Sequence, residues 1–193
     1  MSHRYSSLMF SLRRPSDGGL ARMAASQSGL ELTYSQAGAT AGVMPAGYHH
    51  DRWTTDLGPY DDDRFQRAVQ ALRSWVVQRG AGITVVPGTP VEPGLTFAFS
   101  LELPVGFVTA AGRVVYVTDE PRRYGFAYGT LPAHPEEGEE AFHVGRDGSR
   151  LLFTVAAFSR PRHPLARLGA PVSRALQLRT TRAYQRAMQS AVG

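Results

Sequence analysis

The stretch from Tyr124 to Val144 constrains the fold of this chain more than any other part of it. Its first six residues alternate aromatic side chains with glycine or alanine, in the order Tyr124, Gly125, Phe126, Ala127, Tyr128 and Gly129. Such alternation predicts a strand with one bulky face and one small face. Residues 131–138 contain two prolines and a glycine, which disfavour a helix and predict a turn. A second strand is predicted from about Glu139 to Val144, so the stretch predicts an antiparallel hairpin whose loop carries His134.

Around this hairpin the sequence predicts an early helix, several short strands and a late helix. Residues 61–79 open with three aspartates, which suit the positive end of a helix dipole, and continue with apolar residues spaced three and four apart. The cleanest strand is 95–103, in which Leu or Phe occupies every second position. Further strands are predicted at 48–57, 83–86, 113–118 and 151–158, and a longer helix is predicted from Val172 onward.

This order of elements predicts an α+β fold in which a curved antiparallel sheet packs around the C-terminal helix. That arrangement commonly leaves a cavity between sheet and helix where small apolar ligands bind. We therefore expect aromatic residues of the strands to contact a ligand, although the same stripe equally suits a packed core. The candidate ligand-binding residues are Phe97, Phe99, Tyr124, Phe126, Tyr48 and Arg160.

The composition excludes several kinds of chemistry. The chain of 193 residues fits one domain, and it has no cysteine, which excludes disulfides, thiolate chemistry and cysteine–zinc sites. It also has no lysine, which excludes Schiff-base chemistry. No apolar run approaches the roughly 18 residues that span a membrane, so a cytoplasmic location is expected.

Three residues of the hairpin are candidates for acid–base catalysis. The imidazole of His134 is a candidate because an unperturbed imidazole titrates near neutral pH, and Tyr128 can donate a hydrogen bond to a ligand carbonyl. Glu140 shares a face with apolar residues of its strand, whereas Glu139 points to the other face, so the two carboxylates cannot form a dyad. Each candidate also has a structural interpretation. His134 would cap its loop, Tyr128 would belong to the core, and Glu140 would be bonded to Arg160, Tyr128 or His134.

The sequence does not indicate a metal or nucleotide site. His49, His50 and Asp51 are adjacent, and adjacent residues diverge in a strand, so they lack the spacing of metal ligands. The sequence contains no Gly-x-Gly-x-x-Gly motif, phosphate-binding loop or nucleophile elbow. We therefore expect no cofactor.

Positive charge is concentrated toward the C-terminus. The net charge is +5, and from Ala141 onward the only acid is Asp147. The same part of the chain holds nine arginines, at positions 146, 150, 160, 162, 167, 174, 179, 182 and 186. Nucleic acid or another anionic partner would suit such a run. A solvated arginine face on a terminal helix is the simpler interpretation, so nucleic acid is not the expected partner.

Several segments together resemble one family. They are residues 32–34, 45–48, 65–75, 113–120, 124–140 and 157–161. The most specific is Gly-Phe-Ala-Tyr-Gly-Thr-Leu-Pro-x-His-Pro-Glu-x-Gly-Glu-Glu, at 125–140. On these motifs the chain resembles the domain of unknown function nineteen-ninety family over roughly residues 30–190. The chain departs from the family pattern at Ala141, where arginine is usual, and at Ala111-Gly112. The resemblance implies no established activity, and its proteins look similar to the START-like, helix-grip superfamily.

These observations lead to one domain organisation and two functional hypotheses. Residues 1–28 are expected to form a partly mobile extension, and residues 29–193 a single helix-grip domain. The first hypothesis is a binder of a small apolar metabolite, either a carrier or a cofactor-independent enzyme. Such an enzyme would use Glu140, His134 and Tyr128 to cyclise, dehydrate or isomerise a polyketide-like substrate. The alternative is an interaction protein that uses its arginine-rich C-terminal helix on nucleic acid or another anionic partner.

Overall fold

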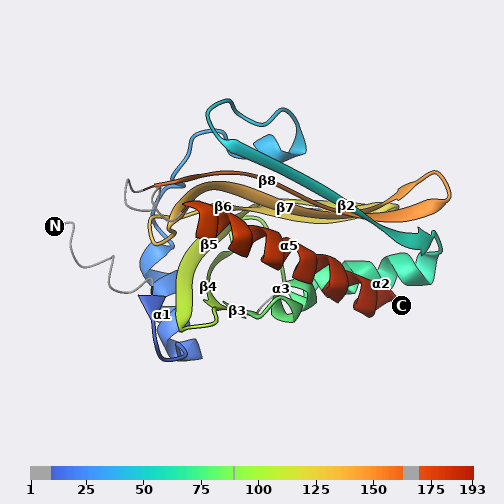
Figure 1. Cartoon of the computed structure of the whole chain (residues 1–193). Coiled ribbons are helices and arrows are strands. Elements are labelled where there is room, and N and C mark those ends of the chain that lie inside the picture. Colours follow the sequence, from blue (N-terminus) through green and yellow to red (C-terminus); the bar gives the residue numbers. More distant parts are fainter. Residues whose placement is uncertain (1–9, 89, 163–169) are drawn as a thin grey trace.

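A curved antiparallel sheet, with a long C-terminal helix crossing its concave side, forms the centre of the molecule (Figure 1). The structure is a computed structural model that describes residues 10–88, 90–162 and 170–193. Its strands follow the order β2-β8-β7-β6-β5-β4-β3, with β1 paired to β5. The strands are β1 (Phe10–Ser11), β2 (His49–Pro59), β3 (Ile83–Val86), β4 (Thr96–Glu102), β5 (Phe107–Glu120), β6 (Arg123–Thr130), β7 (Glu136–Asp147) and β8 (Arg150–Pro161). The helices are α1 (Asp17–Gln27), the 3-10 helix η1 (Ala39–Ala41), α2 (Asp62–Arg73), α3 (Val76–Gly80) and α5 (Ala170–Val192).

The predicted α+β arrangement is confirmed, and the predicted hairpin is formed by β6 and β7. The register of the two strands places Tyr128 opposite Glu140 and Phe126 opposite Phe142. The aromatic face of β6 is buried on the concave side, where Phe126 packs in the main core. The small-residue face is covered from the other side, where a Cβ on Gly129 would overlap the phenol of Tyr34. Both faces of this hairpin are therefore buried.

The early helix predicted at 61–79 is two helices, α2 and α3, which are separated at Trp75. Asp61 caps α2 by accepting a hydrogen bond from the backbone N–H of Arg64 at 2.7 Å. At Trp75 φ is 57°, a left-handed conformation that interrupts the helix. The Trp75 ring is fully buried, and its centroid lies 4.9 Å from that of Phe97 and 5.2 Å from that of Phe126. The spacing of apolar residues could not reveal this break, because it continues through it.

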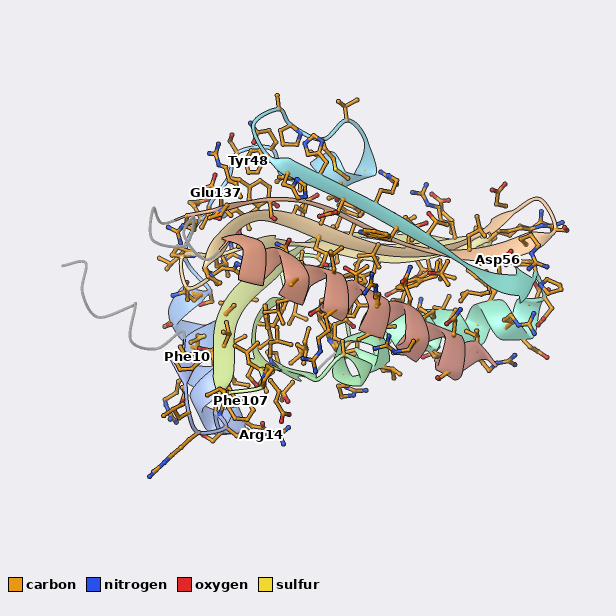
Figure 2. All side chains as sticks on the ribbon, in the orientation of Figure 1. Phe10, Arg14, Tyr48, Asp56, Phe107 and Glu137 are labelled. Atoms are coloured by element: carbon orange, nitrogen blue, oxygen red, sulfur yellow. The ribbon has the colours of Figure 1, made fainter. Side chains whose placement is uncertain are left out.

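The described part of the N-terminal extension, residues 10–28, packs against the sheet. The short β1 pairs with the first two residues of β5, where Figure 2 labels Phe10 and Phe107. Helix α1 buries Leu20 against Ala98 of β4. This part of the chain is therefore attached to the folded body at two places.

Helix α5 packs on the sheet and also on α2 and α3. It lies close to α3 at Gly80, where an ideal Cβ would lie 2.5 Å from the Cβ of Ala187. Tyr184 and Met188 of α5 are buried in the main core. Among the described residues, no helix is both long enough and apolar enough to cross a membrane.

Candidate ligand-binding site

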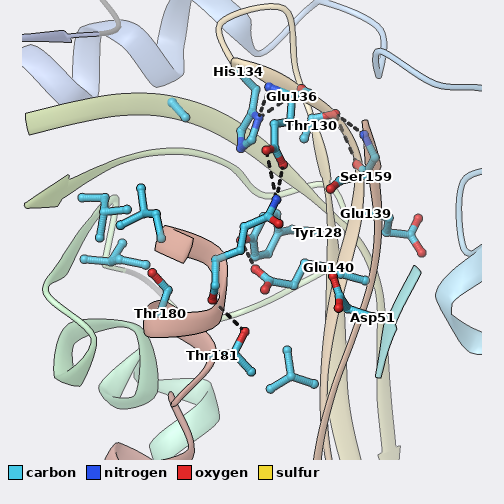
Figure 3. Close-up of a pocket in the computed structure, with 18 of the residues that line it drawn as sticks. Asp51, Tyr128, Thr130, His134, Glu136, Glu139, Glu140, Ser159, Thr180 and Thr181 are labelled. Carbon is cyan, nitrogen blue, oxygen red and sulfur yellow. Dashed lines mark hydrogen bonds between the residues drawn. The ribbon is translucent and has the colours of Figure 1, made fainter. Parts of the chain in front are cut away.

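A cavity of about 210 Å³ lies between the concave face of the sheet and α5 (Figure 3). One side of its wall, from β3, β4 and β5, is apolar and includes Ile83, Phe99, Leu101 and Val108. Polar side chains gather on the other side, which β2, β6, β7 and α5 supply. One buried water molecule needs about 10–15 Å³ measured in the same way. The cavity is therefore large enough for a small organic molecule.

Sheet register brings Tyr128, Glu140 and Asp51 into one row on the cavity wall. Tyr128 pairs with Glu140, Glu140 with Ala157, and Ala157 with Asp51. Residues opposite one another on neighbouring strands point to the same side of a sheet, so all three polar side chains face the cavity. Glu136 precedes Glu140 by four residues on β7 and faces the same side, nearer the β6–β7 loop.

Glu140 and Tyr128 form a hydrogen-bonded pair inside the cavity. The phenol of Tyr128 donates to the carboxyl group of Glu140. Burial, together with the carboxylates of Glu136 and Asp51, raises the pKa of Glu140 to about 7, and the bond from Tyr128 acts in the opposite direction. Burial also raises the pKa of Tyr128 well above its usual value, so the phenol remains a donor. A carboxyl group that titrates near pH 7 can take up or release a proton under physiological conditions.

His134 and Glu136 lie at the loop end of the cavity (Figure 3), and Gln177 of α5 also lines it there. Nδ1 of His134 lies 3.1 Å from the backbone nitrogen of Glu136 and 3.1 Å from its carbonyl oxygen. Burial lowers the pKa of His134 to about 4, so its imidazole is neutral at neutral pH. The side-chain amide of Gln177, on α5, donates to both carboxylate oxygens of Glu136 at 3.0 Å. This contact ties α5 to β7 across the cavity.

Glu139 lies on the opposite face of β7 and is also buried, with 3% of its surface exposed. Its carboxylate accepts hydrogen bonds from the phenol of Tyr34 at 2.6 Å and from the backbone N–H groups of Gly38 at 2.7 Å and Thr40 at 3.0 Å. The hydroxyl of Thr40 is a further donor. Glu139 therefore fixes the segment from Tyr34 to Thr40 on the outer face of the sheet and does not face the cavity.

A second buried histidine, His143, lies on this outer face. The rings of Tyr116 and His143 stack with their centroids 5.9 Å apart, and Oη of Tyr116 lies 3.1 Å from Nε2 of the histidine. Burial, and to a lesser degree the positive charges of Arg123 and Arg52, lowers the pKa of His143 to about 4. This histidine is neutral at neutral pH as well.

The four candidates Glu140, His134, Tyr128 and Phe99 line the cavity together. Three other candidate ligand-binding residues, Phe97, Tyr124 and Phe126, are buried in the main core and do not line it. Trp75 fills the space beside Phe97 and Phe126, so the open volume lies further toward the β6–β7 loop. Tyr124 instead lies under the guanidinium of Arg73, 4.9 Å from it.

Tyr48 and Arg160, the remaining candidates, lie away from the cavity. Arg160 pairs with Glu137 at 2.6 Å, and its guanidinium lies 4.4 Å above the ring of Tyr48. Tyr48 donates to Glu137 at 3.0 Å, and the two residues lie close together at one end of the sheet (Figure 2). Glu137 is an odd-numbered residue of β7, so it shares the outer face with Glu139. Of the three partners considered for Glu140, Tyr128 is the one observed, whereas Arg160 pairs with Glu137 instead.

Among the cavity residues that were not sequence candidates are Asp51, Glu136, Gln177 and Tyr184. Glu136 was missed because the strand was predicted to begin at about Glu139, whereas β7 begins at Glu136. Asp51 could not be predicted, because its place depends on the pairing of β2 with β8. Gln177 and Tyr184 lie on α5, and the sequence alone does not show which side of that helix faces the sheet.

The charged groups outside the cavity are relevant to two other kinds of site, a metal site and a surface for an anionic partner. Over the described ranges, no group of three or more His, Asp or Glu side chains is arranged to hold a metal ion. Of the C-terminal arginines, Arg150 pairs with Asp56 at 2.8 Å and Arg160 with Glu137. Arg179, Arg182 and Arg186 are exposed on α5 at helical spacing and so share one side of it.

The fold is a helix grip, a curved antiparallel sheet packed around a C-terminal helix, and solved structures of other proteins have a similar fold. The crystal structure of Ara h 8.0201 is similar with a TM-score of 0.51 at 13% identity, over 76% of this chain and 98% of that chain. A hypothetical protein of Helicobacter pylori is similar with a TM-score of 0.55 at 14% identity, over 83% of this chain and 95% of that chain. At such identities the likeness concerns the fold alone.

The chain belongs to the family described as Domain of unknown function (DUF1990), whose model matches residues 33–187. A UPF0548 protein of Deinococcus radiodurans is 46% identical over 82 residues, which are 42% of this chain and 41% of that protein. A UPF0548 protein of Arabidopsis thaliana is 31% identical over 116 residues, 56% of this chain and 57% of that protein. The chain thus spans about half the length of these two relatives. A Dictyostelium discoideum UPF0548 protein is 27% identical over 88% of this chain and 89% of its own length.

Proposed function

We propose that this protein binds a small, largely apolar molecule in the cavity between the sheet and α5. The observation that carries the proposal is the division of the cavity wall into an apolar side and a side on which polar groups gather. Apolar walls with a small number of oriented polar groups are characteristic of small-molecule sites. A wall of Phe99, Leu101, Val108 and Val155 would hold the apolar body, and Glu140 with Tyr128 would fix a polar group.

The test is whether filling the cavity abolishes binding. Thr180 faces the cavity from α5, whereas Gln189 is an exposed residue of the same helix. Thr180→Phe should abolish both the binding of a neutral apolar dye and the co-purification of a small molecule in native mass spectrometry. Gln189→Phe, the matched control, should leave both unchanged. If the unmodified protein retains no molecule and binds no dye, or if Thr180→Phe binds as well as the control, the proposal fails.

Glu140 favours a second candidate function, in which the bound molecule is a substrate of acid–base chemistry. A carboxyl group with a pKa of about 7 beside a phenol donor is suited to moving a proton next to a carbonyl group. Neutral His134, at the same wall, would relay that proton. Cyclisation, dehydration and isomerisation of a polyketide-like carbonyl compound all need such a step.

Deuterium exchange distinguishes an enzyme from a carrier. In D₂O the protein should speed deuterium incorporation next to the carbonyl of bound apolar ketones, as followed by mass spectrometry. Glu140→Gln should still bind these ketones, because Tyr128 and the apolar wall remain, but it should lose at least 100-fold in the exchange rate at saturating ketone, the usual scale for a general base. Equal exchange rates for the unmodified protein and Glu140→Gln would contradict the catalytic function and would be consistent with a carrier.

A further inference from the structure

The two outermost strands of the sheet, β3 and β2, are protected to different degrees (Figure 1). β3 has four residues, it ends directly before Pro87, and its Val86 packs on the apolar cluster of α1. Short length, proline and a covering helix are common means of blocking an edge strand. β2 has 11 residues, and its pairing with β8 is regular from His49 to Asp56. An edge strand of this length offers a template for a further strand.

Side chains of β2 are exposed on both faces of the sheet. Trp53 lines the cavity at its rim, on the concave side, and 39% of its surface is exposed. Its neighbours Arg52 and Thr54 therefore lie on the outer face, where both are exposed. Tryptophan is enriched at protein interfaces, so β2 combines a long edge with a residue suited to contact a partner.

The outer row of β2 is self-complementary in charge when two copies run antiparallel. Along the strand this row consists of His50, Arg52, Thr54 and Asp56, so its basic and acidic ends are opposite. An antiparallel pair brings the basic end of each copy to the acidic end of the other, whereas a parallel pair would bring like charges together. Self-complementarity is the property that a two-fold symmetric interface requires. The pattern therefore fits a second copy of the same chain.

Two observations place the two-fold axis at Trp53. The regular part of β2 ends at Asp56, where the register with β8 shifts. An axis at Trp53 pairs residues 50–56 of the two copies, whereas an axis at Thr54 would pair only 52–56. An axis at Arg52 would set two arginines directly opposite each other, which is unfavourable. With the axis at Trp53, Arg52 of each copy lies opposite Thr54 of the other.

We propose that two copies of this chain associate through β2, antiparallel and centred on Trp53, so that their sheets join into one. The interface goes beyond the proposed ligand binding and does not depend on it. A single pair of strands buries less area than the interface of a stable dimer, so the association is weak and depends on concentration. Because Trp53 lines the cavity, the tryptophan of the second copy lies beside the cavity rim of the first.

Single cysteines test the register, because the chain has no cysteine of its own. In Trp53→Cys two cysteines lie opposite each other at the axis, with Cα atoms about 4.5–5.5 Å apart, a distance that a disulfide spans. We expect mild oxidation to convert this variant to a covalent dimer on non-reducing electrophoresis. Thr54→Cys, next to the axis, and Gln189→Cys, at an exposed position of α5, should stay mostly monomeric.

Charge substitutions of Thr54 test the same arrangement with Trp53 in place. Thr54→Glu should tighten self-association at least about threefold, because each new carboxylate lies opposite Arg52 of the other copy. Thr54→Arg should weaken it at least about threefold, because like charges then lie opposite each other. Analytical ultracentrifugation from about 5 to about 500 μM measures the dissociation constants of these weak dimers. Gln189→Glu and Gln189→Arg make the same charge changes on α5 and should leave the constant within about twofold.

Three results would overturn the proposal. The first is an unmodified protein that sediments as a monomer at every concentration. The second is weakening by both Thr54→Glu and Thr54→Arg, or a disulfide in Thr54→Cys but not in Trp53→Cys, because the axis then lies elsewhere. The third is self-association that no Thr54 substitution changes, because the copies then meet through another surface. None of these results affects the proposed ligand binding, which Thr180→Phe tests separately.

Discussion

Glu140 is the residue whose titration most affects the energetics of the cavity. Its pKa is about 7 in the folded protein and about 4.5 in an unfolded chain. The folded state therefore holds a proton that the unfolded state has lost, so this group destabilises the fold as pH rises from 4.5 to 7. Below pH 4.5 the effect is absent, and above pH 7 it is complete.

Replacing this carboxyl group should therefore stabilise the protein at alkaline pH. We expect Glu140→Gln to raise the free energy of unfolding by about 3 kcal/mol at pH 8 and to leave it nearly unchanged at pH 4. Urea unfolding of both proteins at the two pH values measures the difference. A loss of stability at pH 8 would show that Glu140 is structurally required in its charged form.

Gly138 is a residue that no other amino acid should replace. Its φ is 146°, and an added Cβ would overlap the carbonyl oxygen of Phe158 on the neighbouring strand. We expect Gly138→Ala to lower the free energy of unfolding by more than about 2 kcal/mol. Gly29 lies outside the left-handed region and has no atom within 4 Å of its Cβ position, so Gly29→Ala is the control and should change stability by less than about 0.5 kcal/mol. Equal effects in the two variants would contradict this account.

At the scale of elements, β7 anchors a segment on the outer side of the sheet through Glu139. We expect Glu139→Gln to cost about 2–4 kcal/mol, because the amide would present N–H groups to donors that now meet a carboxylate. Hydrogen exchange should locate the loss of protection at residues 34–40. If exchange there is unchanged while the protein is destabilised elsewhere, Glu139 does not hold this segment.

The contact between α3 and α5 depends on a glycine facing an alanine. Gly80→Ala should destabilise the protein by about 1–3 kcal/mol, because its Cβ would lie 2.5 Å from that of Ala187. Ala187→Gly removes the Cβ that the new side chain would meet. The double variant should therefore lose less stability than the sum of the losses in the two single variants. Purely additive effects would mean that the helices adjust without strain.

The elements differed in how far the sequence could predict them. The β6–β7 hairpin and the inward direction of Tyr128 and Glu140 followed from alternation, because a period of two assigns each residue a face. The break at Trp75 did not, since a single left-handed residue leaves the apolar spacing intact. Asp51 joins Glu140 only through the pairing of β2 with β8, a long-range register that local patterns do not encode.

For the whole molecule, two buried neutral histidines should dominate the response to acid. His134 and His143 have pKa values of about 4 in the folded protein, below the usual 6.5, so the unfolded state binds their protons first. Their contribution to stability is complete above pH 6.5 and is lost as pH falls toward 4. Glu140 has the opposite effect over nearly the same pH range, because its folded state holds the extra proton. Unfolding takes up about two protons at the histidines and releases about one at Glu140, so the net uptake is about one proton.

The measurable result is the slope of stability against pH. Between pH 4.5 and 6.5 we expect the free energy of unfolding to rise by about 1.4 kcal/mol per pH unit, and by about twice that in Glu140→Gln. Denaturant titrations at four pH values in this range determine both slopes. A flat profile in the unmodified protein would show that the histidines are not buried in their neutral form.

The break between α2 and α3 also has an optical consequence. The chain has two tryptophans: Trp75 is fully enclosed by the core, whereas Trp53 stands at the rim of the cavity with 39% of its surface exposed. Their emission should therefore separate into a constant short-wavelength component and a long-wavelength component that changes when a molecule enters. The protein thus supplies its own unlabelled reporter of occupancy, together with an internal reference.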